Sequence, residues 1–139
     1  MSGSDGSGAT RVVPVPDDLS REFWTAAAQG RLVVRRCADC GTFHHPPRPL
    51  CPSCRGADCP FTEVSGRARL HSWTRTEHSV LPALAVPYVC LVVELVEQEG
   101  LYLVSDGIGL ELGELRQGMA MHVVFDASAG ELTLPRFVP

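Results

Sequence analysis

"CADCGTFHHPPRPLCPSC", residues 37–54, holds four of the chain's six cysteines in two Cys-x-x-Cys pairs. Each pair presents two thiolates from one tight turn, and two facing turns supply the four soft ligands of a tetrahedral zinc ion. We therefore predict a metal site with four ligands, namely Cys37, Cys40, Cys51 and Cys54. Iron is the alternative ion, because the same four sulfurs accept it. Four protein ligands leave no position for water or substrate, so we predict a structural metal.

The remaining cysteines and the histidines of this segment are predicted not to bind the metal. Cys90 lies within a run of β-branched residues and is expected to be a small buried hydrophobic residue. Cys59 follows the second pair at a less natural spacing and is interpreted as a bystander. Since four cysteines already complete the site, His44 and His45 are expected at the surface or in hydrogen bonds.

The composition indicates a globular protein of the cytoplasm. The chain has 139 residues, of which 45% are hydrophobic and 20% charged, with a formal net charge of -4. This negative charge argues against a protein that coats nucleic acid. No apolar run approaches a membrane span, and the first residues lack the basic-then-apolar order of a signal peptide. In a reducing compartment, paired cysteines indicate a metal rather than disulfides.

The chain divides into four predicted parts: a disordered tail (1–15), a helix (16–30), a zinc ribbon (31–60) and a β-barrel (61–139). The helix places Leu19, Phe23 and two alanines on one face. Trp24 adjoins Phe23 and cannot point the same way. We interpret Phe23 and Trp24 as candidates for partner contact, with packing against their own domain as the alternative for Trp24.

From residue 61 onward, short alternating segments separated by turns predict five strands in a closed barrel. The fold class is therefore mainly β, with an N-terminal helix, a rubredoxin-like zinc ribbon and a five-stranded OB-fold barrel. The longest connection, Thr76–Pro87, is apolar and is the loop that contacts ligands in many OB-folds.

A local excess of arginine in the ribbon predicts a site for a phosphate-bearing ligand or an acidic partner. The alternative is a solvated surface that balances acids elsewhere in the chain. The candidate ligand- or partner-binding side chains, including two at the edge of the long loop, are Phe23, Trp24, Arg35, Arg36, Arg48, Arg75 and His78. No nucleophile elbow or glycine-rich phosphate loop occurs, so no catalytic residue is predicted.

The order of these parts resembles a family long known only as a domain of unknown function. Its members combine an N-terminal helix, a rubredoxin-like zinc ribbon and a C-terminal OB-fold. The resemblance extends over nearly all of the chain after the tail and rests on "FW" (23–24), "GRLVVRRCADCG" (30–41), "PPRPLCPSC" (46–54), "VSGRARLHSWT" (64–74), "PYVCLVVEL" (87–95) and "GMAMHVVF" (118–125).

The resemblance implies an accessory subunit of acyl-CoA metabolism without activity of its own. Relatives associate with thiolase-like enzymes, including aldolases that shorten steroid side chains, and with acyltransferases. We thus expect a hetero-oligomer with acyl-CoA at the interface, in which the partner holds the catalytic residues. A hot-dog-fold enoyl-CoA hydratase is the alternative partner. A module that binds single-stranded nucleic acid is a further alternative, disfavoured by the acidic barrel and the scarcity of aromatic residues.

Overall fold

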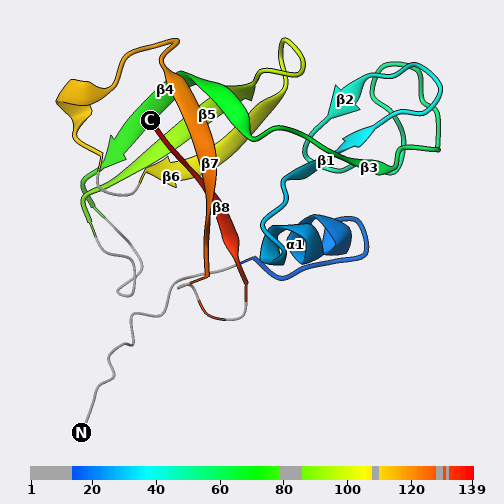
Figure 1. Ribbon diagram of the computed structural model, residues 1–139, viewed down its shortest axis with the longest axis horizontal. Coiled ribbons are helices and arrows are strands. Elements are labelled where there is room, and N and C mark those ends of the chain that lie inside the picture. The colour runs from blue at the N-terminus through cyan, green and yellow to red at the C-terminus, as the bar shows by residue number, and fades with distance from the viewer. Residues whose placement is uncertain (1–13, 79–85, 108–109, 128–129, 131) are drawn as a thin grey trace, which may run out of the picture.

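The computed structural model describes residues 14–78, 86–107, 110–127, 130 and 132–139, which form a helix and two antiparallel sheets (Figure 1). The smaller sheet has the strand order β2-β1-β3, and the larger has the order β6-β5-β4-β7-β8. This architecture confirms the predicted mainly β class. The elements are α1 (Arg21–Ala28), β1 (Val33–Arg36), β2 (Phe43–His44), β3 (Phe61–Glu63), β4 (Arg67–Thr76), β5 (Tyr88–Leu95), β6 (Tyr102–Gly107), the 3-10 helix η2 (Leu112–Glu114), β7 (Ala120–Asp126) and β8 (Leu134–Val138).

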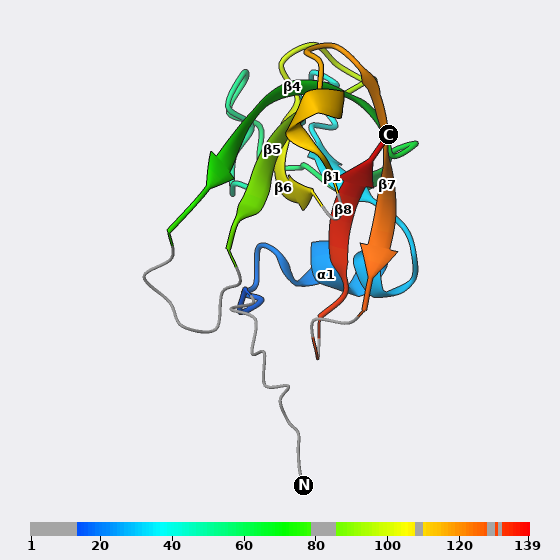
Figure 2. The same cartoon turned by 90° about the vertical axis from the view of Figure 1, so that its left-hand side faces the viewer.

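Helix α1 begins after a reciprocal hydrogen-bonded turn. The backbone N–H of Ser20 donates to Asp17 Oδ1 at 2.8 Å, and the N–H of Asp17 donates to Ser20 Oγ at 3.1 Å. These bonds hold the residues before Arg21 in a turn, so the regular helix spans only eight residues. The helix buries Phe23 and two alanines, as its periodicity predicts. Figure 2 shows α1 at the base of the barrel, next to β8.

The ribbon sheet is built on β1, which pairs with β2 on one edge and β3 on the other. Val33 lies opposite Glu63, and Arg35 lies opposite Phe61. The strand that follows residue 60 therefore completes the ribbon sheet before the chain enters the barrel.

The barrel core comes from the alternation of inward and outward side chains. In β5, every second residue from Val89 to Leu95 is buried. A β-bulge between Leu70 and Ser72 bends β4, which pairs with both β5 and β7. Gly66 has φ +82° and lies so close to Val123 that a Cβ would collide with that side chain. The strand arrangement is that of the predicted five-stranded OB-fold, although the described strands form a partly open barrel rather than the closed one that was expected.

The opening of the barrel lies between β6 and β8, which are not hydrogen-bonded as a ladder in the described strands. Side chains bridge this seam instead. Ser105 Oγ donates to the Pro135 carbonyl at 3.4 Å. Buried Arg136 lies 3.4 Å from an Asp106 oxygen and 3.1 Å from an Asp126 oxygen. We refer to the Ser105–Pro135 and Asp106–Arg136 contacts between the two strands as the β6–β8 seam.

A side-chain amide hydrogen-bonds the ribbon to the barrel, in addition to the hydrophobic core that the two share. Gln98, in the turn after β5, accepts a hydrogen bond from the Phe43 N–H and donates one to the Phe43 carbonyl, both at 2.9 Å. The Gln98 amide thus pairs with Phe43 of β2 as a neighbouring strand would. Across the described residues, no helix is long and apolar enough to cross a membrane.

Candidate functional site

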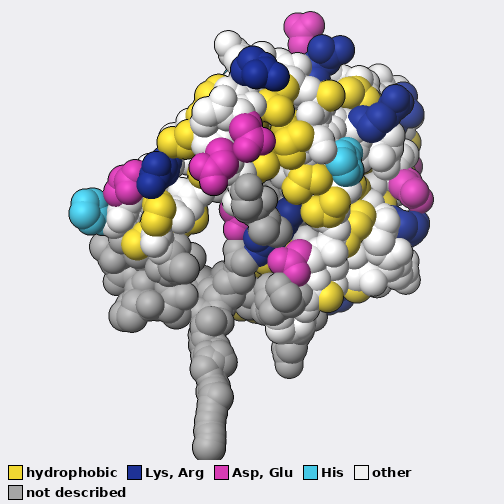
Figure 3. All heavy atoms as spheres, turned by 60° about the vertical axis from the view of Figure 1, so that its left-hand side comes forward, with side chains coloured by type: hydrophobic (Ala, Val, Ile, Leu, Met, Phe, Trp, Pro, Cys, Tyr) yellow, Lys and Arg dark blue, Asp and Glu magenta, His cyan; other side chains and the backbone are white. Residues whose placement is uncertain are grey.

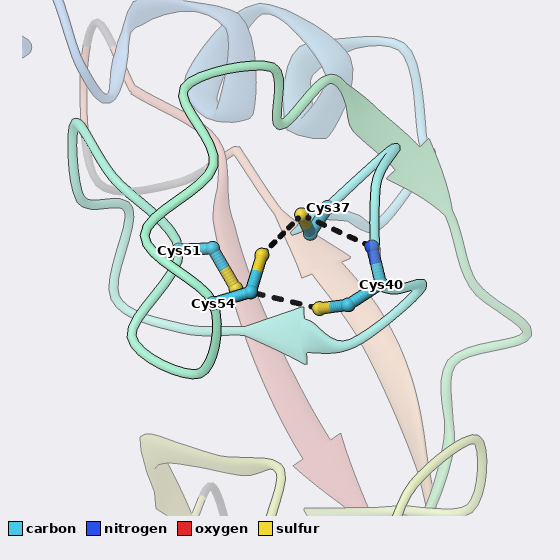
Figure 4. Close-up of side chains that lie close together, drawn as sticks. All are labelled: Cys37, Cys40, Cys51 and Cys54. Carbon is cyan, nitrogen blue, oxygen red and sulfur yellow. Dashed lines mark hydrogen bonds between the residues drawn. The ribbon is translucent and has the colours of Figure 1, made fainter.

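Four cysteine sulfurs gather at the tip of the ribbon (Figure 4). All four lie within 4.8 Å of one another, with Cys37 and Cys54 at 3.5 Å and Cys40 and Cys51 at 3.7 Å. A tetrahedral ion with metal–sulfur bonds of about 2.3 Å requires sulfur–sulfur separations of about 3.8 Å. The spacing therefore fits zinc or iron without rearrangement of the backbone.

Each cysteine pair is formed by a tight turn that the sequence encodes locally. Gly41 N–H donates to the Cys37 carbonyl, and Arg55 N–H donates to the Cys51 carbonyl, both at 2.8 Å. Gly41 and Arg55 have φ of 77° and 65°, in the left-handed region. The first turn places a glycine there, whereas the second uses arginine, a residue that rarely adopts this conformation.

Backbone N–H groups point at three of the sulfurs. Cys37 Sγ accepts from the Cys40 N–H at 3.5 Å, Cys51 Sγ from the Ser53 N–H at 3.4 Å, and Cys54 Sγ from the Gly56 N–H at 3.4 Å. Such donors stabilise thiolates, the form that binds a metal. The turns therefore favour the charge state that a cation requires.

The thiols differ in acidity because their hydrogen-bond partners differ. The Thr42 hydroxyl, 3.2 Å from Cys40 Sγ, and the Thr42 N–H lower the pKa of Cys40 to about 6. At Cys54, the Gly56 N–H lowers the pKa, but the neighbouring Cys37 and Cys40 thiols and burial outweigh it and raise the pKa to about 12. Four thiols this close cannot all ionise alone, whereas a divalent cation compensates their charge.

Gly56 is a close neighbour of the cluster that the sequence analysis missed. A Cβ at this position would lie 2.6 Å from Asp39 Oδ2 and 3.3 Å from the sulfurs of both Cys37 and Cys54. A side chain here would require the Asp39 carboxylate to move and would press on two of the four sulfurs. A glycine two residues after the second Cys-x-x-Cys pair was the signal available in the sequence.

Cys59 and Cys90 lie outside the four-sulfur cluster. Cys59 is buried beside Cys37 and Cys51, and its thiol donates to the Gly56 carbonyl at 3.7 Å. Cys90 is only half-buried, which corrects its expected burial. It alternates with buried Val89 and Leu91 and therefore lies on the outward face of β5. Partial burial raises the pKa of the Cys90 thiol.

Two of the candidate arginines are engaged within the ribbon. Arg35 donates to the Cys59 carbonyl at 2.8 Å, with its guanidinium 5.1 Å from the Phe61 ring centroid. Arg36 donates to the Gly41 carbonyl at 3.0 Å and covers the Phe43 ring at 4.7 Å. Arg36 thus holds the first metal-binding turn, and Arg35 holds the chain at Cys59, uses that the charge count alone did not indicate.

The other candidate cations are spread over the molecule. Arg48 is exposed on the ribbon. Arg75, paired with Glu77 at 2.8 Å, and His78 are exposed at the end of β4, across the barrel from the ribbon (Figure 1). The structure therefore does not gather the predicted cations into one patch. Most of the Thr76–Pro87 loop, residues 79–85, lies outside the described residues.

The aromatic candidates divide between core and surface. Phe23 is buried in the hydrophobic core, and half-buried Trp24 packs edge-on against it at 4.9 Å. His45 packs on Phe23 at 5.4 Å, and burial lowers its pKa to about 4. His44 is only 6% exposed, so a surface position for it is wrong. Its strand, β2, pairs with β1, and Gln98 bonds to the neighbouring residue Phe43.

Apolar side chains also remain on the outside of the barrel. Figure 3 shows hydrophobic side chains gathered across one face, with acidic and arginine side chains along its border. Large exposed apolar residues of the described barrel include Val86, Val96, Tyr102, Val104 and Leu112; Val15 before α1 and Leu50 in the ribbon are exposed as well. Exposed apolar surface rimmed by charges is typical of protein–protein contact sites.

The fold and the cysteine cluster together define a zinc-ribbon/OB-fold protein with a four-cysteine metal site. Residues 24–58 match the ChsH2 rubredoxin-like zinc ribbon domain, and residues 61–126 match the ChsH2 C-terminal OB-fold domain. The chain belongs to the ChsH2 family, also known as DUF35.

Three relatives illustrate the family. A solved structure described as the Ltp2-ChsH2(DUF35) aldolase contains a chain 36% identical to this one, with a TM-score of 0.81 over 91% of this chain and 98% of that chain. A probable enoyl-CoA hydratase alpha subunit of Thermomonospora curvata is 40% identical over 84% of this chain. The 3-oxo-4,17-pregnadiene-20-carboxyl-CoA hydratase alpha subunit of Mycobacterium tuberculosis is 27% identical over 80%. This chain spans 36% and 39% of the length of these two hydratase subunits.

Proposed function

We propose that this chain is a non-catalytic subunit of a thiolase-like acyl-CoA enzyme, such as an aldolase that shortens steroid side chains, a thiolase or an acyltransferase. The chain stabilises its partner and borders the channel for the acyl-CoA thioester. The observation that carries this proposal is the match to nearly the whole of one chain of the Ltp2-ChsH2(DUF35) aldolase.

The chemistry of the metal site supports a structural role within that assembly. Zinc held by Cys37, Cys40, Cys51 and Cys54 has four protein ligands, so it offers no position to polarise a substrate. The site braces the cysteine turns of the ribbon, where the buried cluster consists of Cys37, Cys51 and Cys59 rather than of large apolar side chains. The exposed apolar side chains of the barrel supply surface for a partner.

Co-expression tests the proposal directly. We expect this chain and the Ltp2-like protein encoded by the same genome to elute together at a fixed ratio, with a mass by light scattering that exceeds either component. We also expect acyl-CoA turnover by the complex and none by this chain alone. Separate elution of the two proteins at micromolar concentration would refute the proposal.

A hot-dog-fold enoyl-CoA hydratase is the second candidate partner. It is favoured by the 40% identity to a probable hydratase alpha subunit. The same co-expression experiment with a hydratase-like protein of the genome distinguishes a thiolase-like partner from a hydratase partner. Only the true partner is expected to co-elute with this chain and to gain activity from it.

A further inference from the structure

A groove of about 400 Å³ lies on the barrel where β4 and β7 pair (Figure 1). We call it the β4–β7 groove. Three of its lining residues carry basic side chains, namely Arg67 and Arg69 of β4 and His122 of β7. Val96 and Pro139 are also among its walls, and within the described chain no aspartate or glutamate side chain lines it. The groove is therefore a concave basic surface on a chain whose formal net charge is -4.

The pairing of β4 with β7 places the three basic side chains on one face. Ala68 and Met121 lie opposite each other and are buried, so their neighbours along both strands point outward. Arg67 lies directly opposite His122, and Arg69 follows two residues along β4, a distance of about 7 Å. All three side chains are exposed. At this spacing, the two guanidinium groups and the imidazole can converge on one anion.

The two arginines of the groove have no partner within the described chain. Other described arginines pair with carboxylates or donate to backbone carbonyls, namely Arg21, Arg31, Arg35, Arg36, Arg75 and Arg136. By contrast, no hydrogen bond or ion pair among the described residues uses the guanidinium group of Arg67 or Arg69. These donors therefore remain available for a ligand.

The nearest acidic groups do not neutralise the groove. Glu94 lies opposite Arg69 on the β5 side, but its Oε2 accepts the Gly100 N–H at 2.7 Å, and no ion pair joins it to Arg69 in the described structure. The terminal carboxylate of Pro139 likewise forms no ion pair with either arginine there. Basic groups directly opposite each other on neighbouring strands destabilise the pairing when both are charged. A bound anion would relieve that repulsion between Arg67 and His122.

We propose that the β4–β7 groove binds the phosphate groups of a small molecule, either a free diphosphate or the nucleotide portion of a coenzyme A thioester. The forked donors of Arg67 and Arg69 match the geometry of phosphate oxygens, and His122 adds a donor from the facing strand. The site is formed by this chain alone and does not require the proposed function.

A compact phosphate suits the groove better than an acidic polypeptide segment does. The basic side chains are confined to a small groove, and the turn that begins at its wall residue Val96 carries Glu97 and Glu99. An extended acidic segment would run past these carboxylates and be repelled by them, whereas a phosphate group contacts only the groove.

Calorimetric titration of the metal-loaded full chain with pyrophosphate, at constant ionic strength, tests the site. We expect the Kd to weaken about tenfold in Arg67→Gln and in Arg69→Gln, because each loses a charged fork of donors. Arg67→Lys should weaken it less, since lysine keeps the charge without the fork. Arg116→Gln is the matched control: Arg116 is an exposed arginine of the barrel that does not line the groove, and we expect wild-type binding. Urea unfolding checks that each variant is folded.

Coenzyme A and its phosphate-free part, pantetheine, identify the source of the phosphate. Coenzyme A that binds more tightly than pyrophosphate and with the same dependence on Arg67 and Arg69, while pantetheine does not bind, assigns the groove to the nucleotide portion. Equal affinities of coenzyme A and pyrophosphate assign it to a free diphosphate.

Three results would overturn the proposal. They are the absence of pyrophosphate binding by the wild-type chain at millimolar concentration, a loss in Arg116→Gln equal to that in the groove variants, and binding of citrate as tight as that of pyrophosphate. The last would indicate a surface for carboxylates, as in an acidic polypeptide. Because none of these measurements uses a partner protein, they can fail or succeed separately from the proposed function.

Discussion

Replacing Gln98 should loosen the ribbon from the barrel. Its side-chain amide makes two hydrogen bonds of 2.9 Å to the backbone of Phe43, and both are partly buried. A partly buried hydrogen bond contributes about 1 kcal/mol net, and an abandoned backbone group adds a desolvation penalty. We therefore expect Gln98→Ala to lower the free energy of unfolding by about 2 kcal/mol.

Hydrogen exchange at the Phe43 amide measures this effect locally. Because its N–H donates to Gln98 Oε1, we expect exchange at Phe43 to accelerate roughly 30-fold, the equivalent of about 2 kcal/mol. Gln98→Glu should restore little of this protection, since a carboxylate accepts from the N–H but opposes the Phe43 carbonyl. Urea unfolding followed by tryptophan fluorescence measures the change in the free energy of unfolding of the whole protein.

Gln117→Ala is the matched control, because Gln117 is an exposed glutamine of the same barrel. We expect it to change the free energy of unfolding by less than about 0.5 kcal/mol. Unchanged Phe43 protection in Gln98→Ala, or equal losses in the two variants, would refute the expectation that this amide helps to hold the ribbon on the barrel.

Three further predictions concern the metal site and the seam. Gly56→Ala should speed metal release, because the new Cβ would lie 2.6 Å from Asp39 Oδ2 and 3.3 Å from the sulfurs of Cys37 and Cys54. The release rate is measured with a chromogenic chelator, and a rate equal to that of the wild type would contradict the close fit. Metal affinity should fall as pH decreases, because protons compete with the metal for the thiolates. The fall should be steeper below about pH 6, where the metal-free Cys40 thiol gains a proton in addition to Cys54, whose pKa is about 12. Competition titrations from about pH 5 to 8 in which affinity changes with one constant slope would contradict this prediction. Arg136→Ala should destabilise the barrel by about 3 kcal/mol in thermal unfolding, since it removes a buried cation that contacts two partly buried carboxylates. A loss below about 1 kcal/mol would contradict a stabilising role for these ion pairs.

The features predicted from the sequence are those encoded over short distances. The two cysteine turns, the buried side of α1 and the alternation along β5 each depend on residues within a few positions of one another. These local patterns, with the resemblance to a known family, were enough for the mainly β class and the zinc-ribbon/OB-fold order.

The features that the sequence did not predict depend on distant residues. Gln98 lies 55 positions from Phe43, and nothing in the spacing of either residue indicates their pairing. Arg35 and Arg36 were counted as free charge, although both hydrogen-bond to ribbon carbonyls. By contrast, the outward position of Cys90 follows from the alternation of β5 and could have been predicted.

The central claim is that this chain supports the activity of another enzyme and performs no bond-making itself. The most direct measurement is a titration in which the Ltp2-like protein is held constant, metal-loaded chain is added, and acyl-CoA turnover is followed. The account predicts no turnover from either protein alone and a rise that saturates at a fixed stoichiometry. Turnover by this chain in the absence of the partner, or partner activity indifferent to its addition, would contradict the account.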